Sequence, residues 1–246
     1  MRPAIVTFTD FGVGGPYLGQ VRTVLLREAP EVPVIDLMAD APSFDARAAA
    51  YLLAALMPDM PPCCAVMAVV DPGVGGDRMP MVVEAGGRLF VGPDNGLLEL
   101  VMRRGGVTGC WRIDWRPERL SATFHGRDLF APVVARLARG ESPGHAGCVP
   151  IPPPRRPDWP DDLARVVYVD HYGNAMTGLR ADGLAADAVM VVGGRRLRRA
   201  DRFSAVEEGV AFWYPNSIGL AEVAVNGGSA AGGLGLGIGS PIAVET

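Results

Sequence analysis

Short apolar runs alternate with segments of helical periodicity along the first 150 residues. Apolar runs bounded by turn residues are typical of strands, whereas apolar residues spaced three and four apart are typical of helices. The pattern predicts strands at residues 4–9, 32–37, 65–70, 81–84 and 89–91, and helices at residues 17–28, 44–57, 97–104 and 129–139. This alternation predicts an α/β domain over residues 1–149 with a mainly parallel central sheet.

The pattern changes after a proline-rich segment. Residues 150–162 contain so many prolines that we expect a stiff, extended linker there. Beyond it, short β patterns lie between glycine-rich turns, at residues 165–170, 189–192, 211–213, 221–225 and 241–244. No helical pattern lies among them, so the sequence predicts a small all-β domain over residues 163–246.

Charge and cysteine content narrow the range of partners. The formal net charge is −4 and no basic stripe is present, so we expect no nucleic-acid partner. The arginines at positions 195–199 are expected to form a solvated strand edge. The longest apolar stretch, residues 48–57, is about half of a membrane span, so no membrane association is expected. The four cysteines fit no metal-binding spacing, and together with an N-terminus unlike a signal peptide they favour free thiols in the cytoplasm.

The common cofactor and hydrolase signatures are missing. The glycines at positions 12, 14 and 15 do not complete a dinucleotide-binding fingerprint, because Tyr17 occupies the third required position. No Walker A motif, Gly-x-Ser-x-Gly elbow or His-Glu-x-x-His zinc motif occurs. We therefore expect neither a bound cofactor nor a catalytic metal.

Polar clusters follow the predicted strands, where open α/β sheets bind ligands. Asp10 follows the first strand, Asp71 the third and Asn95 the fifth, while His125 precedes the last helix. Each residue has an ordinary alternative role: a carboxylate in a turn, a helix cap, or a structural histidine. Taken singly, these clusters leave the alternatives open.

Six motifs occur together in one order. They read Thr-Asp-Phe-Gly, Val-Val-Asp-Pro-Gly-Val-Gly, Gly-Pro-Asp-Asn-Gly-Leu-Leu, Phe-His-Gly-Arg-Asp-Leu-Phe-Ala-Pro, Tyr-Gly-Asn and Glu-Val-Ala-Val-Asn-Gly-Gly. This series resembles the S-adenosylmethionine hydroxide adenosyltransferases, which are adenosine-forming S-adenosylmethionine hydrolases related to the fluorinase and chlorinase. The resemblance extends from Asp10 to about Gly228.

The resemblance implies an architecture and a set of substrate contacts. It implies a C-terminal β-barrel domain and a homotrimer, with the substrate between one subunit's first domain and a neighbour's second domain. By similarity, Asp10 would hold the ribose hydroxyls and Phe44 would line the site. The remaining implied contacts are the adenine walls Tyr172 and Phe203, the methionine contacts Asp170, Asn174 and Ser217, the adenine-edge backbone at Asn226 and Gly227, and Asn95 as a further substrate-binding residue.

The implied reaction is the hydrolysis of S-adenosylmethionine to adenosine and L-methionine. A sulfonium is already a good leaving group, so the reaction needs an aligned water and removal of its proton. Asp71 and His125 are expected to accept hydrogen bonds from that water, and Arg78 to favour hydroxide and keep Asp71 ionised. S-Adenosylmethionine is then the substrate and not a cofactor.

Two alternatives remain beside hydrolysis. The halogenating relatives carry Tyr at the position of Asp71, Thr at that of Val74, and Tyr-Ser at that of His125-Gly126. A carboxylate repels halide, so Asp71 favours water. The extra fluorinase loop is also missing between Leu89 and Arg112. A binding protein that senses S-adenosylmethionine or adenosine with little turnover is the other alternative.

Overall fold

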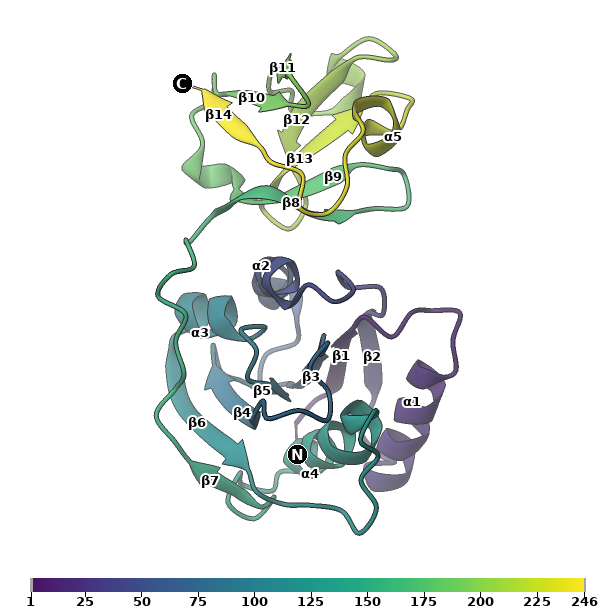
Figure 1. Cartoon of the computed structure of the whole chain (residues 1–246), viewed down its shortest axis with the longest axis vertical. Helices are drawn as coiled ribbons and strands as arrows, with labels where there is room; N and C mark the ends of the chain where they lie inside the picture. The colour runs from purple at the N-terminus through teal and green to yellow at the C-terminus, as the bar shows by residue number, and fades with distance from the viewer. Residues whose placement is uncertain (1, 246) are drawn as a thin grey trace. The chain divides into compact units, whose positions relative to one another are not determined.

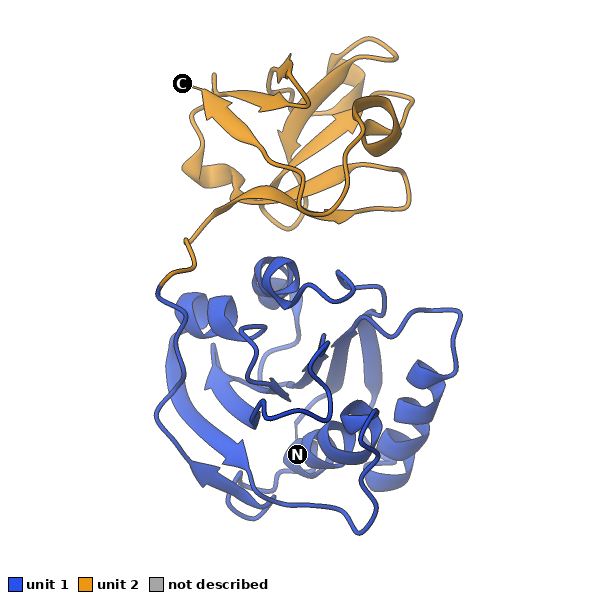
Figure 2. Ribbon diagram, viewed as in Figure 1, with its two compact units in different colours: residues 1–157 blue, residues 158–246 orange. Residues whose placement is uncertain are grey.

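The chain consists of two compact units. The computed structural model describes residues 2–245, and the division falls between Pro157 and Asp158 (Figure 2). This point lies inside the segment 150–162 that the sequence predicts as a linker. Among the described residues, no helix is both long and apolar enough to cross a membrane.

A seven-stranded sheet forms the centre of the first unit, in the order β2-β1-β3-β5-β4-β6-β7. The strands are β1 (Ile5–Thr9), β2 (Val34–Met38), β3 (Ala65–Val69), β4 (Pro80–Ala85), β5 (Arg88–Pro93), β6 (Val107–Ile113) and β7 (Cys148–Pro150). Strands β2, β1, β3 and β5 pair in parallel, and the other neighbours pair in antiparallel fashion. The predicted α/β fold with a mainly parallel sheet is confirmed.

The antiparallel part of this sheet begins at a tight hairpin. Gly86 and Gly87 join β4 to β5, and both have positive φ, of 55° and 73°. Two-residue hairpin loops favour glycine because both positions require positive φ. Strands β6 and β7, which extend the sheet beyond β4, were not predicted, because their apolar positions do not form a continuous run.

Two pairs of helices cover the two faces of the sheet (Figure 1). One face carries α1 (Tyr17–Glu28) and α4 (Ala131–Ala138), and the other carries α2 (Ala46–Leu56) and α3 (Glu99–Gly105). The Asp45 side chain caps α2 by accepting a hydrogen bond of 2.9 Å from the Ala48 N–H. Helix α4 begins later than predicted, because Gly126–Phe130 forms a π-helical turn before it. The core beneath α1 and α4 includes Ile5, Leu25 and Met67.

The second unit is built from two antiparallel sheets. One has the order β12-β13-β9-β8 and the other β11-β10-β14. The strands are β8 (Leu163–Val169), β9 (Ala175–Arg180), β10 (Val189–Val192), β11 (Arg195–Leu197), β12 (Ala211–Pro215), β13 (Leu220–Val225) and β14 (Ala243–Glu245). The all-β prediction is confirmed. The barrel implied by the resemblance is not seen, because the described residues form separate sheets and no closed one.

The interior of this unit contains Trp213, whose indole N–H donates to the Ala188 carbonyl at 3.0 Å. A short helix, α5 (Ala230–Leu234), was not predicted from its glycine-rich sequence. The Ser229 hydroxyl caps it by accepting from the Gly232 N–H at 3.0 Å. This cap explains how so short a segment is held in helical form.

Candidate active site

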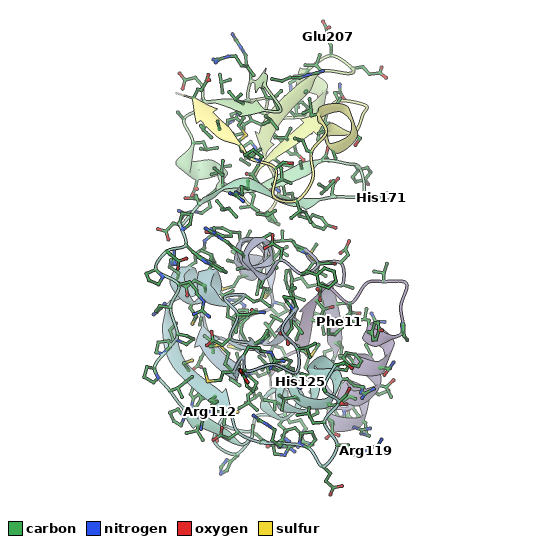
Figure 3. All side chains as sticks on the ribbon, viewed as in Figure 1. Phe11, Arg112, Arg119, His125, His171 and Glu207 are labelled. Carbon is green, nitrogen blue, oxygen red and sulfur yellow. The ribbon has the colours of Figure 1, made fainter. Side chains whose placement is uncertain are left out.

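The carboxyl ends of β1 and β3 open onto the pocket of the first unit. Because these strands are parallel neighbours, the residues that follow them, Asp10 and Asp71, lie at the same edge of the sheet. The pocket has a volume of about 520 Å³. Its lining includes Asp10, Phe11, Tyr17, Gln20, Ser43, Phe44, Asp71, Val74, Thr123, Phe124, His125, Gly126 and Arg127. Figure 3 labels Phe11 and His125 among the side chains of this unit.

Asp71 and Arg78 form a nearly buried ion pair. The Arg78 Nε donates to Asp71 Oδ1 at 3.0 Å and to Oδ2 at 2.8 Å, and Nη2 donates to Oδ2 at 2.5 Å. The two side chains are only 5% and 10% exposed. The guanidinium also lies 5.4 Å from the centre of the Phe130 ring, a cation–π distance. The glycine-rich loop between them thus returns Arg78 to the carboxylate.

His125 joins this pair through its Nδ1 atom, which lies 2.8 Å from Arg78 Nη2. A guanidinium can only donate, so Nδ1 accepts and the neutral ring carries its proton on Nε2. Burial and then the Arg78 charge lower the pKa of His125, which favours this neutral form. The sequence predicts that His125 accepts a hydrogen bond from water; in this tautomer the nitrogen left for such a contact, Nε2, is a donor.

Asp10 lies beside a strained residue. Its carboxylate accepts a hydrogen bond of 3.4 Å from the Phe44 N–H, and burial raises the pKa of Asp10 while this bond opposes the rise. Phe44 has φ of 62°, in the left-handed region that non-glycine residues seldom adopt, and its side chain is 80% exposed. Backbone strain of this kind is concentrated at functional sites. Asp10 and Phe44 both line the pocket.

One wall of this pocket is aromatic and was not predicted. The rings of Phe11 and Tyr17 meet the Phe124 ring edge to face, with centroids 5.6 and 5.4 Å away. Arg127 lies over Phe124 and is paired with Asp128. Phe11 and Tyr17 lie close together in sequence, whereas Phe124 comes from a distant segment, so the contact of the three rings depends on the fold. The sequence signal was that each residue lies near the end of a predicted strand or helix.

Asn95 was expected among the substrate-binding residues, but it is not among the residues lining the pocket. Its Nδ2 donates to the Val70 carbonyl at 2.8 Å, and its Oδ1 accepts from the Leu97 N–H at 3.1 Å. Val70 directly precedes Asp71. The Asn95 side chain therefore braces the backbone that presents the carboxylate.

The second unit has its own pocket, with a volume of about 630 Å³. Its lining comprises Asp170, Tyr172, Asn174, Phe203, Tyr214, Val225, Gly227 and Gly228. Five of the expected substrate contacts are thus brought together. Tyr172 is 77% exposed, so its ring is available for stacking.

The Asp170 carboxylate closes the turn that carries Tyr172. Oδ1 accepts from the N–H groups of Tyr172 and Asn174 at 2.9 and 2.8 Å, and Oδ2 accepts from Asn174 Nδ2 at 3.0 Å. A carboxylate oxygen can accept more than one hydrogen bond, so Oδ2 retains capacity for a cationic donor. Asn174 itself supports Asp170.

Two expected contacts of the second unit are placed differently. Ser217 is exposed in the turn after β12 and is not part of the pocket lining. The backbone N–H of Asn226 donates to the Val210 carbonyl, and its C=O accepts from the Gly209 N–H. Both backbone groups of Asn226 thus have a partner within the unit, and Gly227, not Asn226, lines the pocket.

A buried hydrogen-bond network behind this pocket was not identified as part of the site. Glu222 is 1% exposed and accepts from the Tyr214 hydroxyl at 2.6 Å and from Asn216 Nδ2 at 2.7 Å. Burial raises the pKa of Glu222, and the nearby Asp170 charge adds to this rise. Burial and the hydrogen bond to Glu222 raise the pKa of Tyr214. Along β13, Ala221 and Val223 pack into the core of the unit, and Glu222 points to the opposite face, which is also buried. The signal in the sequence was the place of Glu222 at the start of the Glu-Val-Ala-Val-Asn-Gly-Gly motif.

No group of three His, Cys, Asp or Glu side chains that could hold a metal ion occurs within residues 2–245. The four cysteines are free thiols.

Comparisons with known proteins cover both units. Residues 5–147 match the SAM hydroxide adenosyltransferase N-terminal domain, and residues 164–243 match the corresponding C-terminal domain. The chain is 40% identical to the (R)-S-adenosyl-L-methionine hydrolase of Salinispora arenicola, over 93% of this chain and 92% of that protein. It is 38% identical to the enzyme of the same name from Thermus thermophilus, over 98% and 99%.

A solved structure and a more distant relative extend the comparison. The crystal structure of an uncharacterized conserved protein from Thermotoga maritima has a TM-score of 0.89 and 30% identity, covering 98% of this chain and 100% of that one. The fluorinase of Actinopolyspora mzabensis is 32% identical over 42% of this chain and 39% of its own.

Proposed function

Because this chain belongs to the SAM hydroxide adenosyltransferase family, we propose that it hydrolyses S-adenosylmethionine to adenosine and L-methionine. The curated relatives are named hydrolases of the (R) epimer, so we propose this sulfonium configuration for the substrate. One observation carries the proposal for the reaction: Asp71 and His125 line the pocket that also contains Asp10, and Arg78 connects the two side chains.

The reaction is a displacement at the ribose C5′ carbon. The water oxygen attacks C5′ opposite the sulfur, the C5′–S bond breaks, and its electron pair remains on sulfur as the thioether of methionine. The proton lost by the water must be accepted by the protein or the solvent. Because the sulfonium leaves without protonation, the chain needs only a proton acceptor and precise alignment of the water.

The residues of the set have distinct tasks in this step. Asp71 is the proton acceptor, since its carboxylate lines the pocket and Oδ1 accepts only the longer Arg78 contact. His125 donates its Nε2–H to the water oxygen, and this hydrogen bond orients the other lone pair of that oxygen towards C5′. Arg78 holds both partners in place, and its positive charge stabilises developing hydroxide.

Substrate binding divides between the two pockets. Asp10 accepts hydrogen bonds from the ribose hydroxyls, and Phe44 lines the same pocket. Tyr172 and Phe203 supply aromatic surfaces for adenine, and Asp170 attracts the substrate ammonium. We propose a homotrimer in which the first-unit pocket of one subunit is completed by the second-unit pocket of a neighbour.

We also propose that the protein is located in the cytoplasm. Its free thiols, including that of the exposed Cys63, fit a reducing compartment.

The pocket disfavours halide as the nucleophile. An anion beside Asp71 would meet a carboxylate in a partly buried site, where repulsion is stronger than in water. A sensor of S-adenosylmethionine would bind ligand without needing an ion pair and a histidine aligned in the pocket. The connected set therefore supports hydrolysis over both alternatives.

The test is product analysis in ¹⁸O-labelled water with chloride present. Purified protein should convert S-adenosylmethionine to adenosine carrying ¹⁸O in its 5′-hydroxyl, with the (R) epimer consumed first. Formation of adenosine without ¹⁸O in its 5′-hydroxyl would contradict attack of water at C5′. Formation of 5′-chloro-5′-deoxyadenosine would indicate halide transfer. Stoichiometric bound ligand without adenosine over hours would support the sensor.

A further inference from the structure

Two loops carry the water-activating residues, and they meet at Gly75. The loop after β3 contains Asp71 and Arg78, and the segment before the π-helical turn ends at His125. A β-carbon on Gly75 would lie 2.3 Å from the carbonyl oxygen of Ala122 and 3.3 Å from its carbonyl carbon. The Ala122 backbone thus occupies the space that any side chain at position 75 would need.

The other glycines of this loop are less constrained. A β-carbon on Gly73 would lie 3.7 Å from Arg78 Cγ and 3.9 Å from Asp71 Oδ1, which are ordinary contacts. One on Gly76 would be 3.1 Å from the Gly73 carbonyl oxygen, within the loop itself. Gly75 also has φ of 80°, which favours glycine. The close approach to the second loop is therefore a property of Gly75.

The segment from Ser121 to His125 is held tightly enough to transmit a displacement of Ala122. The Ser121 N–H donates to Asp128 Oδ2 at 2.9 Å, and the Ser121 hydroxyl accepts from the Thr123 N–H at 3.3 Å. The Phe124 N–H donates to the Ser121 carbonyl at 3.4 Å. A shift of Ala122 is thus passed on to His125, three residues later.

We propose that Gly75 is a positioning residue for hydrolysis, which lets the two loops approach closely enough for Arg78 to bridge Asp71 and His125. The expected loss of kcat rests on the proposed function, whereas the expected loss of the contact between Arg78 and His125 rests on the geometry alone. A side chain at position 75 would separate the loops. Arg78 and Asp71 lie on the same loop and would stay paired, whereas the contact between Arg78 and His125 would be lost.

The ionisation of His125 reports this separation directly. The groups that act on His125 are Arg78 and Arg116, which lower its pKa, and Asp71 and Asp128, which raise it, in addition to burial. When the loops separate, Arg78 and Asp71 move away from His125 together. Because the lowering by Arg78 is larger than the rise caused by Asp71, and because His125 becomes less buried, the pKa of His125 should rise. The chain has three histidines, so the ring signals can be assigned by substituting the other two.

The experiment compares Gly75→Ala with Gly106→Ala. Gly106 also has positive φ, of 70°, but a β-carbon there would meet nothing within 4 Å beyond its chain neighbours, so it controls for backbone strain. NMR titration of the free proteins should show a raised pKa of His125 in Gly75→Ala only. The kcat for S-adenosylmethionine should fall on the order of 10- to 100-fold with little change in KM, since misplacement by about 1 Å can cost that much.

The two readouts separate this inference from the proposed function. A raised pKa of His125 supports the positioning role even if no hydrolysis is observed, whereas an unchanged pKa and kcat in folded Gly75→Ala would overturn it. Should Gly75→Ala not fold, Gly75→Asn introduces the same β-carbon in a residue that tolerates positive φ. Failure of that variant to fold as well would also overturn the inference, because the contact would then serve folding and not placement.

Discussion

In the first unit, the buried carboxylate of Asp71 lies against a guanidinium, whereas in the second unit the buried carboxylate of Glu222 is held by a phenol and an amide. Asp170, which lines the second pocket, likewise accepts from neutral N–H groups. The charge of Asp71 is thus balanced within the protein, whereas Asp10, in the same pocket, accepts from a neutral N–H group. In the second pocket, negative charge remains for a cationic ligand to balance.

This difference matches the two tasks that the reaction requires. An ion pair keeps a proton acceptor ionised and oriented, which suits chemistry at C5′. Carboxylates held by neutral donors attract a substrate that carries an ammonium and a sulfonium. The ion-paired set of the first pocket should therefore control kcat, whereas carboxylates held by neutral donors, Asp10 in the first pocket and Asp170 in the second, should control substrate affinity. Substitutions can test this division.

The largest effect is expected from Asp71→Asn. The amide keeps the shape of the side chain but cannot accept the proton of the water, and general-base assistance contributes about 10²- to 10⁴-fold. We expect kcat to fall on the order of 10³-fold, with adenosine affinity nearly unchanged by calorimetry. The matched control is Asp170→Asn, which should raise KM and leave kcat within a few-fold. If Asp170→Asn lowers kcat as much as Asp71→Asn does, the division of tasks is wrong.

The next effect concerns Asp10, a binding residue within the first pocket. Asp10→Asn weakens the hydrogen bonds to both ribose hydroxyls, and hydrogen bonds to charged groups contribute about 1.5–3 kcal/mol. The Kd of adenosine should rise roughly 10- to 100-fold by the same estimate. Calorimetry with 2′-deoxyadenosine provides the control, because a ligand lacking one hydroxyl should lose less affinity in the variant. Equal losses for both nucleosides would contradict diol recognition.

Glu222 allows the comparison between the two units to be tested through the pH dependence of the free energy of unfolding. The pKa of Glu222 is raised in the folded protein, so the native state binds its proton more tightly than the unfolded chain does. The contribution of Glu222 to the free energy of unfolding is therefore fully present below the pKa of an ordinary glutamate. It declines as the pH rises through the raised value.

Glu222→Gln should remove this decline. Denaturant unfolding of both proteins from pH 4 to pH 8 gives the difference in unfolding free energy, and the raised pKa of Asp10 cancels because both proteins share it. The wild type should lose stability relative to Glu222→Gln as the pH rises. A pH-independent difference would show that Glu222 does not carry this effect.

The parts of the site that could be predicted from sequence are those set by local pattern. Asp10 and Asp71 follow apolar runs, and parallel pairing necessarily brings the ends of such strands to one edge. The direction of the His125 hydrogen bond could not be predicted, because it depends on Arg78, 47 residues away. The backbone hydrogen bonds of Asn226 with Gly209 and Val210 could not be predicted either, because they depend on how the chain folds around Asn226.

The fold shows the same limit. The continuous apolar run at β3 predicted a buried strand, whereas β6 mixes buried, half-buried and exposed positions without a regular alternation and gave a weaker signal. The aromatic wall of Phe11, Tyr17 and Phe124 combines residues from segments far apart in sequence. Local periodicity contains no information about such a long-range contact. It also does not tell whether sheets close into a barrel, which the resemblance implied and the described residues do not show.

The smallest effect is expected from Asn95→Ala, which tests whether the first pocket depends on its backbone supports. The Asn95 amide holds the Val70 carbonyl next to Asp71, and it contacts the pocket only through that backbone. The substitution removes both hydrogen bonds of the Asn95 side chain. Leaving a buried partner unsatisfied costs about 1–3 kcal/mol, so Tm should fall by several degrees. The kcat should fall a few-fold with KM unchanged, because Asp71 shifts while the ribose and adenine contacts remain. A raised KM with unchanged kcat would instead return Asn95 to the substrate-binding residues, and it would show that this division of tasks is incomplete.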